Sequence, residues 1–215
     1  MTKKLTVWLF LATLILSNDI NSRPISYADS WTLMQMNNYN KHSFHLHYSP
    51  SVNYSVGYKG EYWLKNEWQF HAVQINYLIN RINKPKSQTN IYLKNGLGLA
   101  NSKHKDFDSK TEPSFFSGLS MDWEDRKFFL GYENRINYNP TIDRFFLQKA
   151  RIGFAPYVGK YGDLHSWLML QIDHMPKAEN KIVYSPILRM FKGDYLAELG
   201  LTNYKDFMFN FIKRF

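Results

Sequence analysis

The chain has 215 residues, enough for one domain of ordinary size, and it contains no cysteine, which excludes disulfides, thiolate metal sites and lipid attachment to cysteine. Its formal net charge is +9, but the Lys and Arg residues are scattered rather than clustered, so an anionic lipid surface or an anion-friendly interior explains the charge better than nucleic acid does. Hydrophobic residues make up 44% of the chain while the mean hydropathy is −0.45, so apolar residues are dispersed among polar ones, as alternating strands require.

Residues 1–28 have the pattern of a secretory signal peptide. A positively charged start is followed by an apolar segment, residues 5–16, that is too short for a transmembrane helix. An amphipathic or buried N-terminal helix is the alternative. Small residues within 26–28 favour cleavage just before Asp29, and residues 20–22 offer a second, less typical site, so the cleavage position stays open.

From residue 30 onward, segments of strand length alternate apolar and polar residues and are separated by turn residues. The segments are 31–37, 42–49, 52–64, 68–81, 89–100, 115–123, 128–138, 146–154, 164–173, 182–191, 195–201 and 204–215. They predict about twelve strands, with ten as the alternative count. After the leader, no apolar run approaches the roughly 18 residues of a transmembrane helix, so a membrane-spanning chain would cross as strands. A soluble β-sandwich is the alternative architecture.

The connections between these segments differ in length and composition. Short connections rich in Pro or Gly fall near residues 50, 85, 125, 160 and 193, at every second junction. The longest polar stretch, residues 101–113, falls at one of the junctions between them. If the mature chain starts in the periplasm, the short connections are periplasmic and the longer ones extracellular.

The last segment, residues 204–215, alternates strictly and ends on an aromatic residue. One of its faces carries Phe207, Phe209, Phe211 and Phe215. The segment resembles the C-terminal assembly signal of bacterial outer-membrane β-barrel proteins that the barrel-assembly machinery inserts. Lys213 departs from the pattern because it lies on the apolar face, where a charge is tolerable only close to a membrane interface. The segment is expected to close the barrel by pairing with residues 195–201 and with the first strand.

The resemblance implies an all-β fold, a single up-and-down antiparallel transmembrane β-barrel over residues 29–215, in the outer membrane of a Gram-negative envelope. It also implies contact with outer-membrane lipid and lipopolysaccharide, and with the barrel-assembly machinery during insertion. No cofactor and no nucleic-acid partner are expected, and the oligomeric state stays open.

Inward positions of the predicted strands carry many polar and charged side chains. The predicted lumen-lining set is Lys94, Glu133, Arg135, Lys149, Arg151, His165, Asp173, Arg189 and Glu198. These groups would select small hydrophilic or anionic solutes in a channel, or would pair with one another and fill the interior. The leading hypothesis is a small pore or passive channel, and the alternative is a closed barrel that serves as an adhesin, a scaffold or an accessory to envelope metal handling.

Two further patterns suggest chemistry. His45 and His47 share one face of a strand, which is half of a copper or zinc site, and scattered interface histidines are the alternative interpretation. His47 and Ser49 resemble the His-x-Ser pairing of outer-membrane phospholipases and lipid A deacylases, which makes a lipid-modifying hydrolase the third hypothesis. The pair would point inward, near a periplasmic turn, so no catalytic residue is assigned. The inward glycines Gly96 and Gly98 are expected to make room for bulky neighbours.

Overall fold

The structure is a computed structural model that describes residues 27–107, 109–160 and 162–215. The predicted signal peptide, residues 1–28, therefore lies almost entirely outside the described residues. Among those described, no helix is long and apolar enough to cross a membrane.

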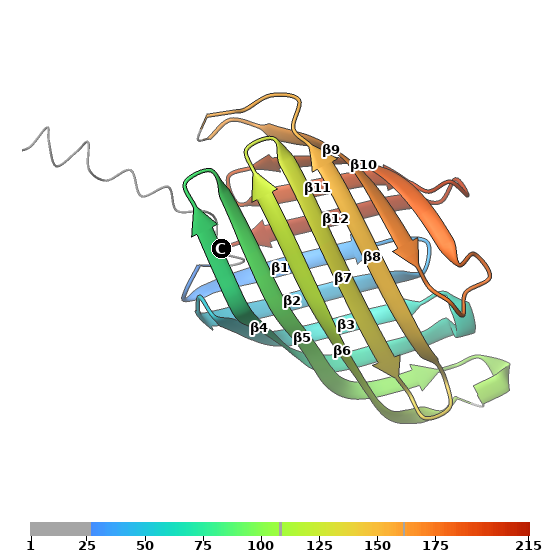
Figure 1. The fold of residues 1–215 in the computed structure, drawn as a ribbon. Coiled ribbons are helices and arrows are strands. Elements are labelled where there is room, and N and C mark those ends of the chain that lie inside the picture. The colour runs from blue at the N-terminus through green and yellow to red at the C-terminus, as the bar shows by residue number, and fades with distance from the viewer. Residues whose placement is uncertain (1–26, 108, 161) are drawn as a thin grey trace, which may run out of the picture.

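Strands account for most of the described chain. They are β1 (Ser30–Asn37), β2 (Lys41–Ser51), β3 (Tyr54–Trp63), β4 (Trp68–Lys84), β5 (Ser87–Ser102), β6 (Thr111–Asp125), β7 (Phe128–Tyr138), β8 (Arg144–Phe154), β9 (His165–His174), β10 (Ile182–Lys192), β11 (Tyr195–Leu201) and β12 (Phe207–Arg214). Two single-turn 3-10 helices, η1 (Lys65–Glu67) and η2 (Lys105–Phe107), lie in connections. Each strand pairs antiparallel with its neighbours in sequence, and β1 pairs with β12, so the sheet closes into a barrel (Figure 1). The predicted twelve-strand up-and-down barrel is confirmed.

The seam between β1 and β12 joins the first strand to the last. The backbone N–H of Trp31 donates to the carbonyl of Phe215 at 2.7 Å, and the N–H of Phe215 donates back at 2.9 Å. β12 also pairs with β11 along its whole length. The final strand therefore leaves no open edge, which confirms the prediction that it closes the barrel.

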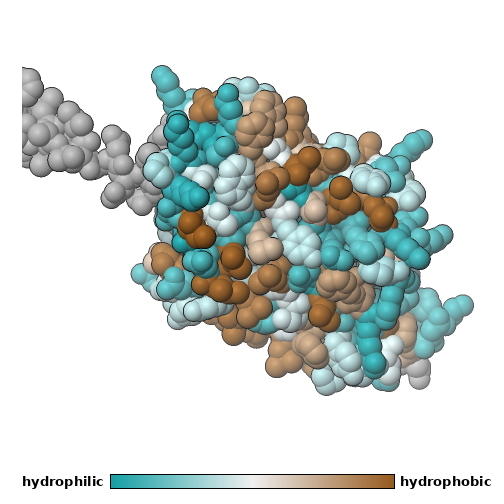
Figure 2. Space-filling view, viewed as in Figure 1, coloured by the Kyte–Doolittle hydropathy of each residue, from teal (hydrophilic) through white to brown (hydrophobic). Residues whose placement is uncertain are grey.

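The outer wall is apolar, as the alternation predicts. Its most exposed side chains include Val73, Leu97 and Ile152 in the wall and aromatic residues such as Trp31, Phe128 and Phe207 towards the ends. Figure 2 shows hydrophobic residues spread over the middle of one face, with hydrophilic residues gathered mainly at its margins. This distribution is typical of a barrel surrounded by lipid and flanked by aromatic girdles.

The predicted assembly-signal residues lie on this outer wall. Phe207 and Phe215 are among its most exposed side chains, and Phe209 and Phe211 lie between them, partly covered. Lys213 pairs in register with Tyr195, the first residue of β11, and its ammonium lies 5.4 Å from the Tyr195 ring centroid. The charge that departs from the apolar pattern thus lies at the rim, next to the β10–β11 turn, where its stem can reach water.

The connections at the two ends of the barrel differ. At the end that holds both chain ends, called the terminal end below, four connections have two residues each, 52–53, 85–86, 126–127 and 193–194. The fifth, residues 155–164, is the longest connection between any two strands. The expectation that the longest connection lies at the opposite end, called the loop end, over residues 101–113 is therefore wrong. Both ends of that polar stretch belong to β5 and β6, which pair in register as far as Asn101 and Thr111, so the connection itself covers only residues 103–110.

Two irregularities in strand pairing also depart from the prediction. Pro50 does not end its strand, because β2 continues to Ser51 past a register shift between Tyr48 and Ser51. A second shift lies between Leu78 and Asn80 in β4. Alternation within segment 68–81 predicts that Asn80 faces inward with Gln74 and Asn76. An extra residue at a bulge reverses the alternation, so Asn80 pairs with the outward residue Ile91.

A single residue in the middle of the outer wall tests the membrane-facing surface. Ala150 is exposed in β8 and pairs with Tyr132 on one side and Ile172 on the other. Ala150→Arg is expected to lower the free energy of unfolding in lipid vesicles by about 2–4 kcal/mol, because a guanidinium at the bilayer midplane is poorly solvated. Ala150→Leu, the apolar size control, is expected to be neutral or stabilising. Equal urea stability of the two variants would contradict a lipid-facing position.

Candidate functional site

The barrel interior is divided into two halves, and the half near the loop end is packed. Trp63, Trp68, Phe70, Phe116 and Phe145 are buried there in one hydrophobic cluster. The indoles of Trp63 and Trp68 stack with ring centroids 5.4 Å apart, and Phe145 lies 4.5 Å from Trp63. These rings come from residues at or near the loop ends of their strands, so they close the barrel behind that rim.

The strands make room for this packing with small inward residues. A Cβ on Gly96 would overlap the Phe116 ring, and one on Gly98 would overlap the backbone of His71. The prediction that these glycines admit bulky neighbours is confirmed for Gly96. The aromatic cluster therefore requires glycine in β5, because a larger side chain at Gly96 would overlap the Phe116 ring.

A buried carboxylate adjoins the aromatic cluster on its inner side. The Glu61 side chain is 0% exposed, forms an ion pair with Lys41, and lies 3.3 Å from the Lys59 ammonium. Arg135 approaches it in bidentate fashion, with Nη1 to Oε1 at 2.7 Å and Nη2 to Oε2 at 2.8 Å. The Trp63 indole also donates to Glu61. One carboxylate thus neutralises part of the charge of three cations across the barrel.

Aromatic faces share in balancing the excess positive charge. The Arg135 guanidinium lies 4.1 Å from the Phe116 centroid, and the Lys59 ammonium 4.4 Å from it. Lys41 lies 4.8 Å from the Trp63 centroid. Cation–π contacts of this kind strengthen where water is excluded, so charge and aromatic packing form one layer that fills the barrel.

The connection between β7 and β8 folds over this layer from the loop end. Glu112 accepts hydrogen bonds from the backbone N–H of Thr141, the Thr141 hydroxyl and the backbone N–H of Ile142, at 2.9, 2.7 and 2.9 Å. Ile142 is buried within the aromatic cluster. A charged anchor therefore holds an apolar side chain in the mouth of the barrel.

Asp143 ends the same connection. Burial raises the pKa of its carboxyl above the ordinary value, and the Lys65 ammonium and the backbone N–H of Arg144 offset part of the rise. A carboxyl whose pKa is raised in the folded state binds its proton more tightly there. Acid therefore favours the folded connection, and this contribution is lost as the pH rises through the raised pKa.

The other half of the interior holds a cavity of about 710 Å³. On most strands that reach it, the lining residues lie towards the terminal end, although on β1 they extend past the middle of the strand to Met34 and Met36. On β5 they run from Gln88 to Lys94 and stop before Gly96, and on β10 they are Arg189 and Phe191. From the longest connection, Ala155, Tyr157, Val158 and Gly159 also line it. The interior is thus a charged vestibule at the terminal end, backed by the packed layer.

The predicted lumen-lining residues divide between these halves. Lining the cavity are Lys94, Glu133, Lys149, Arg151, His165, Arg189 and Glu198. Arg135 binds Glu61 in the packed layer, and Asp173 is buried, accepting a hydrogen bond from Gln171 at 2.7 Å. All nine occupy inward positions, and whether they select solutes remains a prediction.

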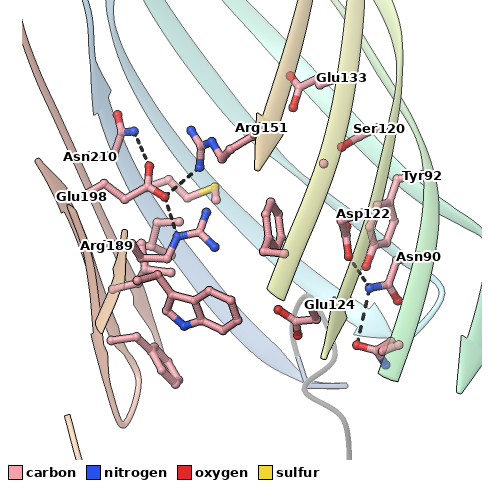
Figure 3. Close-up of a pocket in the computed structure, with 18 of the residues that line it drawn as sticks. Asn90, Tyr92, Ser120, Asp122, Glu124, Glu133, Arg151, Arg189, Glu198 and Asn210 are labelled. Atoms are coloured by element: carbon pink, nitrogen blue, oxygen red, sulfur yellow. Dashed lines mark hydrogen bonds and ion pairs between the residues drawn. The ribbon is translucent and has the colours of Figure 1, made fainter. Parts of the chain in front are cut away.

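Two groups of polar side chains face each other across the cavity (Figure 3). On one wall, Glu198 of β11 accepts from Arg151 Nη1 at 2.8 Å, Arg189 Nε at 2.7 Å and Asn210 Nδ2 at 2.8 Å. On the other wall, Asp122 of β6 accepts from Asn90 Nδ2 at 2.7 Å. Lys94 and Glu133 form a separate pair at 2.9 Å.

The candidate metal and catalytic residues lie on β2. His45 and His47 are buried and line the cavity, with ring centroids 5.7 Å apart, and His45 Nε2 and His47 Nδ1 have no hydrogen-bond partner in the described chain. His45 pairs in register with Lys59, whose ammonium disfavours a cation there. No group of three or more His, Cys, Asp or Glu residues suited to a metal occurs in the described ranges. A metal at His45 and His47 remains a prediction.

Ser49 lies on the same inner face as His47. The Ser49 hydroxyl is buried and has no hydrogen-bond partner among the described residues, so His47 does not activate it in this structure. A nucleophilic serine requires a base within hydrogen-bond reach. The geometry gives no support to the proposed His–Ser pair.

Sequence reasoning missed the centre of the packed layer. Lys59 and Glu61 have the parity opposite to the outward residues Tyr54 and Tyr58, so alternation alone marks them as inward. Their meeting with Arg135 joins β3 to β7 across the barrel, and no local pattern predicts that contact.

Removing the Glu61 carboxylate tests the packed layer. Glu61→Gln is expected to lower the free energy of unfolding by about 3–5 kcal/mol, since it leaves Lys41, Lys59 and Arg135 without a counter-charge. Glu133→Gln is the matched control. Its pair with Lys94 is 30% and 37% exposed, so a loss of at most about 1 kcal/mol is expected. Similar losses in urea titrations of the refolded variants would contradict the special role of Glu61.

Comparison with known protein families found no match, and comparison with curated protein sequences found none. Among solved structures, the KdgM porin in complex with disordered oligogalacturonate is similar at a TM-score of 0.52 and 7% identity, over 86% of this chain and 98% of that one. A second KdgM porin structure gives 0.51 and 8% over 86% and 98%, and a NanC porin structure gives 0.42 and 8% over 86% and 97%. At such low identity the two KdgM comparisons show the fold alone: this chain shares the closed β-barrel fold of those porins.

Proposed function

We propose that this chain is an integral outer-membrane β-barrel that acts as a small channel for hydrophilic solutes. The observation that carries the proposal is a charged cavity of about 710 Å³ inside a closed barrel whose outer wall is apolar. An apolar wall suits lipid, and a charged interior suits solutes that keep part of their hydration shell.

The lengths of the connections indicate how the barrel is oriented in the outer membrane. Four of the five terminal-end connections are two-residue turns, as periplasmic turns are, so we place the terminal end in the periplasm. Partners are then outer-membrane lipid and lipopolysaccharide around the wall, and the barrel-assembly machinery during insertion. The outward aromatic residues of β12 support that route.

The charge of the cavity bears on the solute. Its lining contains seven Lys and Arg residues, Lys59, Lys94, Arg126, Lys149, Arg151, Arg189 and Arg214, and five acidic residues, Asp122, Glu124, Asp125, Glu133 and Glu198. The similar KdgM porin is described in complex with oligogalacturonate. A slight excess of cations supports passage of acidic or polar solutes, whereas the many carboxylates oppose a strongly anionic preference.

The packed layer stands in the path of any solute that crosses. Conduction therefore requires the side chains around Phe116 or the connection anchored by Glu112 to move. The same layer favours a second candidate, a closed barrel that serves as a scaffold or an adhesin. Opening and permanent closure differ in one measurable quantity, the ion conductance of a single barrel.

Two neighbouring phenylalanines on β6 separate these functions. Phe116 is 3% exposed and packs in the interior, while Phe115 is 45% exposed on the outer wall. Phe116→Ala is expected to raise the single-channel conductance in planar bilayers, because it removes a ring from the layer that blocks the path. Phe115→Ala, the same change on the other face, is expected to leave the conductance unchanged.

The same conductance measurements can contradict the channel proposal. Absence of conductance in both the wild type and Phe116→Ala, with the barrel folded by circular dichroism, would remove the channel and leave the closed barrel. Equal increases in both variants would show that the layer does not set the conductance.

A further inference from the structure

We propose that the vestibule at the terminal end binds small zwitterions, compounds that carry a carboxylate and an ammonium on one short chain. The inference deepens the proposed function, because it names the solute class, and it rests on that function for the route by which the solute leaves. The binding itself requires only the cavity.

One wall of the vestibule carries the Arg189 guanidinium, which has unused hydrogen-bond donors. Arg189 uses Nε for Glu198, and within the described chain its two terminal nitrogens make no hydrogen bond. Its guanidinium lies 5.1 Å from the Phe129 ring centroid, which holds the group in place at the cavity surface. Because Arg151 shares the same Glu198 oxygen, two guanidiniums meet one carboxylate and this wall keeps a positive charge. A ligand carboxylate suits the free fork of Arg189.

The facing wall carries the Asp122 carboxylate, which has an unused hydrogen-bond acceptor. Asp122 uses one oxygen for Asn90, and no cation of the described chain lies within ion-pair distance of it. Lys94, the nearest candidate on β5, is paired with Glu133 at 2.9 Å. Glu124, two residues further along β6, adds negative charge on the same inner face. A ligand ammonium suits the free oxygen of Asp122.

The two charges belong to different sides of the barrel. In the ring of twelve strands, β10 and β11 lie four and five strands away from β6. Figure 3 shows Arg189 and Glu198 on one side of the opening and Asp122 on the other. The ion pairs of the described chain include none between Arg189 and Asp122, so both groups keep capacity for a ligand. Phe129 and Trp167 line the same cavity and offer apolar contact to a short carbon chain.

Electrostatics then ranks the possible ligands. A monovalent anion satisfies Arg189 and leaves Asp122 unpaired, and a monovalent cation does the reverse. A zwitterion pairs with both at once and adds no net charge to the cavity. Because hydrogen bonds between charged groups are stronger than neutral ones, the second contact is expected to strengthen binding at least about tenfold.

The test measures binding to the refolded wild-type protein in a nonionic detergent by calorimetry. The probes are the ω-amino acids of three to six carbons and, for the one that binds best, the alkanoate and the alkylammonium ion of equal length. The ω-amino acid is expected to bind at least about tenfold more tightly than either single-charge analogue. An alkanoate that binds equally well would make this an anion site and overturn the inference, as would absence of binding by every probe.

Variants assign each end of the ligand. Asp122→Asn is expected to weaken the zwitterion about tenfold and to spare the alkanoate. Arg189→Gln is expected to weaken the zwitterion and the alkanoate and to spare the alkylammonium ion, and Arg189→Lys, which keeps the charge, is expected to restore part of the loss. Asp106→Asn and Lys192→Gln, on exposed residues outside the cavity lining, are the matched controls. Loss of the zwitterion preference in the controls would contradict the assignment.

The outcome separates this inference from the proposed function. Zwitterion binding without conductance would leave a binding vestibule in a closed barrel. Conductance without zwitterion preference would leave a channel of different selectivity.

Discussion

Closure of the sheet is the constraint on which the rest of this structure depends. A strand edge in lipid would leave backbone N–H and C=O groups without partners, so the seam between β1 and β12 has to pair along its length. The Trp31 and Phe215 hydrogen bonds complete that pairing at the terminal end. Once the ring is closed, alternation fixes which side chains face lipid, and every inward group must find its partner inside a confined space.

Confinement explains the arrangement of the buried charges. Glu61 and Glu198 each gather two or more cations from different strands, and the remaining lone pairs are taken by Trp63 and Asn210. Buried carboxylates of this kind are costly when they lose a partner, so they tie distant strands into one register. The two centres also differ. The surroundings of Glu61 are aromatic and buried, whereas those of Glu198 open onto the cavity.

The sequence alone was sufficient for the fold, because a period of two repeated in twelve segments is a local signal. It placed Arg151, Arg189 and Glu198 inside the barrel, since each occupies an inward position on a regular strand. Alternation gave the wrong side for Asn80, because one extra residue at a bulge reverses the parity of the strand. The predicted length of the connection 155–164 was also wrong, because turn residues mark where a connection lies and not how long it is. Strand bounds and the side that a residue faces depend on pairing with the neighbouring strands, and the sequence of one segment carries no information about that pairing.

The packed layer was beyond such reasoning for a different reason. Trp63 and Trp68 look like ordinary girdle residues in the sequence, and only the inward turn of the β7–β8 connection, with Ile142 buried among them, makes them a core. Contacts such as Glu61 with Arg135 join residues 74 positions apart. They arise from the diameter of the closed ring and the inclination of its strands, quantities that no stretch of residues encodes by itself.

Because the packed layer fills the loop-end half of the interior, the barrel resembles a cup that opens at the terminal end rather than an open tube. Its two mouths present unequal barriers: a solute arriving at the terminal end enters a cavity with charged walls, while one arriving at the loop end meets stacked indoles and the buried Ile142. While the packed layer is closed, residence inside such a cup is governed by exchange with one compartment, so occupancy follows the concentration on that side alone. When the layer opens, an applied voltage of either sign acts on an asymmetric energy profile, and current through the barrel would rectify.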